Sequence, residues 1–146
     1  MAVGLLDILK PIVFTVARGG SATRVLQSIA SGALGREAYQ GGPTTALLGL
    51  GLHFFIAFTV FAVYYFASRR IPLLVSRALV LGPLYGVAVH CFMQFVVIPL
   101  SAIGPIKASP AVFFEGLLTH VVCVGLPTGL VVRFASGRGA ATRSGG

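Results

Sequence analysis

One apolar stretch, residues 44–67, constrains this chain more than any other feature, because it contains no Asp, Glu, Lys or Arg. A helix of about 20 such residues crosses the roughly 30 Å hydrocarbon core of a bilayer. Similar stretches follow at 78–100 and 111–134, and a shorter one at 1–17 opens the sequence. We therefore predict an all-α, polytopic membrane protein whose single domain, residues 1–134, contains four transmembrane helices.

Composition and charge agree with this fold class. Charged residues make up 10% of the chain, against about 25% in an average soluble domain, which excludes a soluble globular protein. The net charge is +8, but the basic residues flank the apolar stretches, where such residues set topology and face anionic lipid. The expected partner is the lipid bilayer rather than nucleic acid, with a homo-oligomer or a larger membrane complex as further alternatives.

The segments outside the long apolar stretches carry weaker signals. Residues 21–35 have apolar residues at helical spacing and are predicted to form an interfacial amphipathic helix, with Arg24 and Gln27 on its wet side. The stretch 1–17 is short for a full crossing, so an interfacial helix is the alternative there. Residues 135–146 are rich in Gly, Ser and Arg and are predicted to form a disordered basic tail.

The distribution of basic residues predicts the orientation. Basic residues concentrate on the cytoplasmic side of membrane proteins. The side that would hold the turn at 68–77 and the tail carries six basic residues, and the opposite side carries four. We therefore expect both termini in the cytoplasm. The six are Arg69, Arg70, Arg77, Arg133, Arg138 and Arg143, and the four are Arg18, Arg24, Arg36 and Lys107.

Each of the three long stretches places a glycine four positions before a histidine. Residues four apart share a helix face, and small residues let neighbouring helices approach closely. Ordinary helix packing, with the polar side chains as hydrogen-bonding groups, is the simplest interpretation. The helix-packing candidates are Gly49, Gly82, Gly86, Gly116, Gly125 and Gly129, and the histidines are His53, His90 and His120.

The three histidines also admit a functional interpretation. Alternating helix directions would place all of them about 14–15 Å from the same membrane surface, given the rise of a helix. Two histidines on facing helices suit a haem, three suit zinc or copper, and an imidazole layer can relay protons. His53, His90 and His120 are therefore candidate cofactor-binding residues, and the cofactor stays open between none, a metal and haem.

Four other polar residues fall inside apolar stretches. Asp7 and Lys10 are three apart on one helix face and are expected to neutralise each other near the membrane surface. Gln94 continues the face that carries Gly86 and His90. Glu115 is expected near the outer, non-cytoplasmic surface of the membrane. Ionisable groups within membrane helices are functional candidates by default.

The sequence contains no recognisable enzyme motif. Catalytic elbows, zinc-protease pairs, nucleotide-binding loops and Cys-x-x-Cys are all absent, and the chain has only three acidic residues. We therefore expect a non-catalytic protein, with a role in the cell envelope or in stress, or as an accessory subunit. The alternatives are a redox or electron-transfer subunit that uses the histidines, and an oligomeric ion or proton conduit.

Several segments of the sequence resemble those of a known group of proteins. They include the segments RVLQSIASGALG at 24–35, LGLGLHFFIAF at 48–58 and GPLYGVAVHCFMQFVVIPLSA at 82–102. The chain resembles small, uncharacterised four-helix membrane proteins of proteobacteria that are YagU-like in general appearance. The resemblance covers roughly residues 1–134. It implies a bacterial inner-membrane protein, with no established activity and no site residues to carry over.

Overall fold

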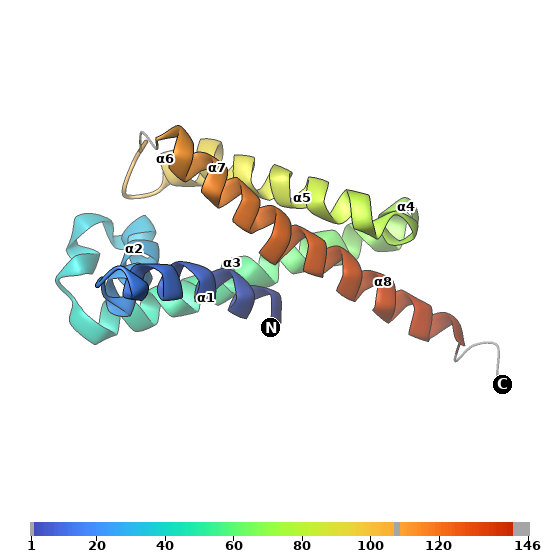
Figure 1. Ribbon diagram of the computed structural model, residues 1–146, viewed down its shortest axis with the longest axis horizontal. Coiled ribbons are helices and arrows are strands. Elements are labelled where there is room, and N and C mark those ends of the chain that lie inside the picture. The colour runs from blue at the N-terminus through green and yellow to red at the C-terminus, as the bar shows by residue number, and fades with distance from the viewer. Residues whose placement is uncertain (1, 107–108, 142–146) are drawn as a thin grey trace.

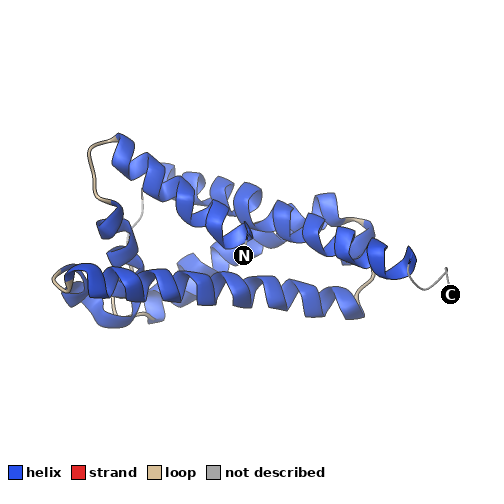
Figure 2. Cartoon of the chain, turned by 90° about the horizontal axis from the view of Figure 1, so that it is seen from below, coloured by secondary structure: helices blue, strands red, loops and turns tan. Residues whose placement is uncertain are grey.

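The computed structural model describes residues 2–106 and 109–141, with side chains from 4–106 and 109–136. This part of the chain is helical with no strand, as Figure 2 shows, which confirms the predicted all-α class for these residues. In Figure 1 the helices form two groups joined by a tight turn at α4. The first group is α1 (Ala2–Ala17), α2 (Ala22–Leu34), η1 (Gly35–Tyr39) and α3 (Gly42–Arg70); after α4 (Leu73–Ser76), the second is α5 (Ala78–Phe92), η2 (Met93–Val97), α6 (Ile98–Leu100), α7 (Pro110–Thr119), η3 (His120–Gly125) and α8 (Leu126–Ala141).

Three helices in the described part of the chain are long and apolar enough to cross a membrane. They are Gly42–Arg70, Ala78–Leu100 and Pro110–Ser136. The second and third each run as one continuous helix through a π-helical turn. α1 has 16 residues and is about 24 Å long, which is short of a bilayer core. The structure therefore supports a membrane protein with three helices that could span.

The two π-helical turns have a common cause. Each contains the residue four positions before a proline: Phe95 before Pro99, and Cys123 before Pro127. A proline cannot donate the usual backbone hydrogen bond, and its ring collides with the carbonyl of that residue. A wider turn relieves this collision without breaking the helix.

α1 runs antiparallel to α3 and covers only part of its length (Figure 1). Gly4, near the start of α1, faces Phe54 and Ala57, and a Cβ added there would lie 3.1 Å from the Cβ of Ala57. These two residues lie near the middle of α3. The described start of α1 is therefore level with the middle of α3 and not with its far end.

Glycines bring α5 into backbone contact with η3 and α8. A Cβ on Gly82 would lie 2.7 Å from the carbonyl oxygen of Gly125, and one on Gly86 would lie 2.5 Å from that of His120. Gly129 likewise faces the carbonyl oxygen of Ala78. This seam leaves no room for side chains and closes the half of the second helix group nearest to α4.

α2 packs against the beginning of α3, and this contact corrects one expectation. Gly49 lies directly against the carbonyl oxygen of Leu26. Gln27, predicted on the wet side, is buried, and its Nε2 donates to the carbonyl oxygen of Gly42 over 3.0 Å. The prediction for Gln27 was wrong because its amide bonds to the first turn of α3. Arg24 is exposed as expected.

The end of the chain differs from the predicted disordered tail. α8 continues as a helix to Ala141, so residues 135–141 are helical. The remaining residues of that predicted tail, 142–146, lie outside the described residues, as does Lys107 in the loop before α7.

Candidate intramembrane binding site

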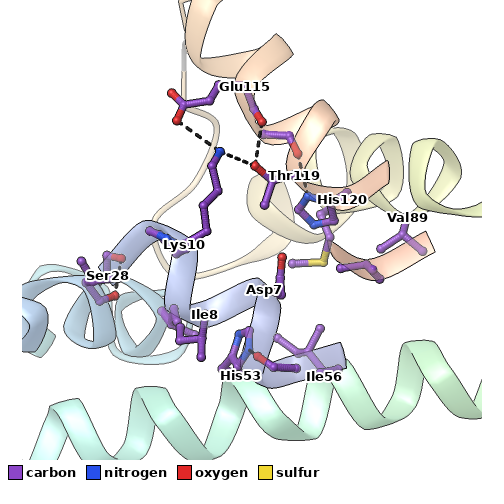
Figure 3. Close-up of a pocket in the computed structure, with 18 of the residues that line it drawn as sticks. Asp7, Ile8, Lys10, Ser28, His53, Ile56, Val89, Glu115, Thr119 and His120 are labelled. Atoms are coloured by element: carbon purple, nitrogen blue, oxygen red, sulfur yellow. Dashed lines mark hydrogen bonds and ion pairs between the residues drawn. The ribbon is translucent and has the colours of Figure 1, made fainter. Parts of the chain in front are cut away.

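A cavity of about 440 Å³ lies between the two helix groups, where α1, α3, α5 and α7 meet (Figure 3). Its walls are mostly apolar, and Ile56, Val60, Val89 and Met93 are among them. A few polar side chains interrupt this wall. They include Asp7, Lys10, His53, Glu115, Thr119 and His120.

An ion pair closes one end of the cavity. Lys10 Nζ lies 3.2 Å from Glu115 Oε1 and also donates to the hydroxyl of Thr119 (Figure 3). The Thr119 hydroxyl in turn donates to the carbonyl oxygen of Glu115 over 2.8 Å. The Lys10 and Glu115 side chains stay 40% and 47% exposed, so the pair sits at the rim. The expected pairing of Lys10 with Asp7 is replaced by this one, because the lysine reaches across to α7.

Asp7 lies deeper in the cavity than the ion pair. It is half-buried on α1, and Figure 3 shows it directed into the space between the helices. Among the described residues it has no hydrogen bond and no ion pair. The register of α1 on α3 places Asp7 about level with His53. His53 in turn lies roughly 16 Å along α3 from Gly42, by the helix rise.

His53 attaches α1 to α3. Its Nε2 lies 2.8 Å from the carbonyl oxygen of Gly4, and the side chain is buried. Because a carbonyl oxygen can only accept, Nε2 carries the proton and donates it. This histidine is therefore committed to holding the two helices together.

His90 and His120 contact each other across α5 and η3. Their Nδ1 atoms are 3.3 Å apart, and His120 Nδ1 also lies 2.9 Å from the carbonyl oxygen of Gly116. That carbonyl requires a proton on His120 Nδ1, so His90 Nδ1 is the acceptor and His90 carries its proton on Nε2. This Nε2 is buried, with no partner among the described residues. Gly116 is necessary here, since a Cβ on it would lie 2.8 Å from the His90 ring.

The structure thus brings together two of the three predicted histidines and places the third elsewhere. Gly86 and Gly116 pack around His90 and His120, whereas Gly49 faces α2, so His53 turns toward α1. Within the described residues, no three His, Cys, Asp or Glu side chains are grouped to hold a metal ion. Structural metal sites are built from four such ligands, and a hydrogen-bonded pair accounts for the observed geometry.

Gln94 does not extend the glycine–histidine face. Gly82, Gly86 and His90 are buried, whereas Gln94 is partly exposed within η2. A π-helical turn takes more residues than an α-helical turn, so Gln94 is rotated off the shared face. The apolar cavity wall was not predicted, because its only signal in the sequence is the absence of charge.

Comparisons with known proteins add no assignment. No protein family matches the chain, and neither the curated proteins nor the solved structures contain a match.

Proposed function

We propose that this chain is a non-catalytic integral membrane protein that binds a small amphiphilic molecule between its two helix groups. Such a protein would act as an accessory or envelope subunit that holds or presents its ligand. The observation that carries the proposal is the 440 Å³ cavity between helices, with mostly apolar walls that a few polar groups interrupt. Ligand pockets in proteins typically have volumes of about 300–1,000 Å³ and this same mixture of linings.

The arrangement of the lining favours an amphiphile over a wholly polar ligand. Ile56, Val60, Val89 and Met93 form an apolar wall, while Lys10 and Glu115 stand at the rim. An alkyl chain is matched by the wall, and a polar head group by the polar side chains of the lining. A membrane supplies molecules of this kind at high local concentration.

The second helix group favours binding over conduction. A conduit needs a polar path through the whole membrane, but beyond His90 the path meets the backbone seam of Gly82, Gly86 and Gly125. The cavity therefore fits a site open toward one membrane face. This distinguishes the proposal from an ion or proton channel formed by a single chain.

The proposed location is a bacterial inner membrane, with the C-terminus in the cytoplasm. The arginine bias and the resemblance to small proteobacterial membrane proteins support it. The turn at 71–77 contacts α8, whereas Ala102 donates to the carbonyl oxygen of Gly32 at the opposite end of the molecule. This segregation matches the two sides expected from the charges. A cytoplasmic N-terminus additionally requires α1 to cross the bilayer.

Two tryptophan variants on α3 test whether the cavity binds. Val60 lines the cavity and Val63 is exposed on the outside of the same helix, so Val60→Trp fills the cavity and Val63→Trp is its matched control. The probes are three dodecyl chains that end in a trimethylammonium, a hydroxyl or a carboxylate. Native mass spectrometry of the detergent-released protein counts the bound probe molecules.

The proposal predicts that at least one probe binds in a one-to-one complex with the native chain and with Val63→Trp. Val60→Trp should lose this complex while keeping its helical content by circular dichroism. If none of the three probes binds, or if Val60→Trp binds as well as Val63→Trp, the proposed function is overturned.

A further inference from the structure

We infer that the ligand of this cavity carries a positive charge, an alkylammonium group, and that the Asp7 carboxylate is its counter-charge. This inference rests on the proposed function, because it names the chemical class of the molecule that the cavity holds. It begins from the charges of the lining residues. Lys10 and Glu115 neutralise each other over 3.2 Å, so Asp7 is the carboxylate left over.

The position of Asp7 makes a lone carboxylate costly. It is half-buried among apolar helices, about one helical turn below the ion pair. A carboxylate that lies among apolar side chains is stabilised by a cation beside it. No described side chain supplies that cation, because Lys10 is held by Glu115 and Thr119.

Three donor groups around the cavity already have partners. His53 Nε2 is bonded to the carbonyl oxygen of Gly4, and His120 Nδ1 to that of Gly116. The Lys10 ammonium is engaged at the rim. A head group whose only charge is a phosphate or carboxylate would find no free donor among these three groups, and it would meet the Asp7 charge. An ammonium group relieves that charge instead.

The apolar wall indicates that the rest of the ligand is an alkyl chain. Val60 and Met93 provide surface for an alkyl chain beside the charged group. An amine-headed membrane lipid and a soluble amphiphilic amine both have this chemistry. The experiment therefore includes a phosphatidylethanolamine arm and a dodecyltrimethylammonium arm.

Asp7→Asn is the central variant because it removes the charge and keeps the shape. Glu37→Gln removes the same charge from an exposed position on η1, outside the cavity, and serves as the matched control. Native mass spectrometry measures the Kd of the ammonium, hydroxyl and carboxylate dodecyl probes, and of short-chain phosphatidylethanolamine and phosphatidylglycerol. Sodium chloride is exchanged for ammonium acetate, and the pH is varied between arms.

The ammonium probe should bind the native chain and Glu37→Gln about tenfold or more tightly than the hydroxyl probe, because only its charge is opposite to that of Asp7. In Asp7→Asn the two probes should bind equally. Tighter phosphatidylethanolamine than phosphatidylglycerol binding identifies a lipid as the source, and preference for the soluble ammonium probe identifies a free amine.

Three outcomes would overturn the inference while leaving the proposed function intact. The first is equal binding of all three head groups to the native chain. The second is an unchanged preference in Asp7→Asn. The third is binding that tracks sodium or pH and not the head group, which would mean that a metal ion or a proton neutralises Asp7. Failure of every probe to bind would instead overturn the proposed function itself.

Discussion

Lys10 on α1 and Glu115 on α7 form an ion pair with 3.2 Å between Nζ and Oε1, although they lie 105 residues apart in the sequence. The pair joins the short first helix to the second helix group at the rim of the cavity (Figure 3). Thr119, one turn further along α7, accepts a hydrogen bond from the same ammonium. Because the ion pair bridges the two helix groups, it stabilises the position of one helix group relative to the other. It also stabilises the charged forms of Lys10 and Glu115.

The effects of removing the two partners of this ion pair should not add. Lys10→Met or Glu115→Gln alone breaks the pair, so the second substitution has no ion pair left to break. We expect a coupling free energy of about 1 kcal/mol, since the pair is partly exposed. A double-mutant cycle on unfolding in detergent measures it. Strictly additive single effects would show that the two side chains do not interact.

The seam between α5 and η3 should tolerate no added methyl group. Gly86→Ala places a Cβ against the carbonyl oxygen of His120 and should destabilise the fold by about 1–3 kcal/mol. Gly51→Ala is the control, because a Cβ there meets nothing within 4 Å, and it should be neutral or gain up to about 1 kcal/mol. Thermal unfolding in detergent measures both. Equal melting temperatures would place Gly86 against lipid.

The three histidines should show different ring tautomers. The hydrogen bonds assign the proton to Nε2 in His53 and His90 and to Nδ1 in His120. Nitrogen-15 NMR of histidine-labelled protein distinguishes the two forms, and added zinc should leave the spectrum unchanged. Stoichiometric zinc, copper or iron in protein purified without a histidine tag would contradict this assignment and restore the cofactor hypothesis.

The arginine bias predicts which end of the molecule faces the cytoplasm. Gln40 and Ile71 are exposed at opposite ends of α3 and provide matched labelling positions. In a background where Ala replaces Cys91 and Cys123, an impermeant thiol reagent should label Gln40→Cys from outside intact cells and leave Ile71→Cys unlabelled. A reporter active only in the cytoplasm should work after Gly146. The reverse labelling pattern would invert the orientation.

Sequence reasoning predicted the helices well because membrane helices are defined by local composition. The uncharged stretch 44–67 lies inside α3, and 78–100 coincides with a continuous helix. The burial of Gln27 could not be predicted, since it depends on the packing of α2 against the first turn of α3 at Gly42. A pattern along one helix does not say which neighbour that helix meets.

For the site, too, the sequence indicated the position of a residue along its helix but not which helix it contacts. Spacing grouped His53 with His90 and His120, whereas in the structure His90 contacts His120 and His53 bonds to Gly4. Depth along a helix is readable from sequence, whereas rotation about the helix axis depends on which glycine meets which partner. For the same reason, local spacing favoured an Asp7–Lys10 pair over the distant pair that forms.

The position of a bound amphiphile shows whether the cavity between the two helix groups is its binding site. A dodecyltrimethylammonium carrying a diazirine in mid-chain is photolysed with the protein in lipid nanodiscs, and the adducts are located by peptide mass spectrometry. Saturable adducts are expected on Val60 and Met93, which line the cavity, and they should be lost in Val60→Trp. Unsaturable adducts confined to the outward-facing Phe55 and Phe95 would mean that the probe only samples the lipid surface and that the cavity binds nothing.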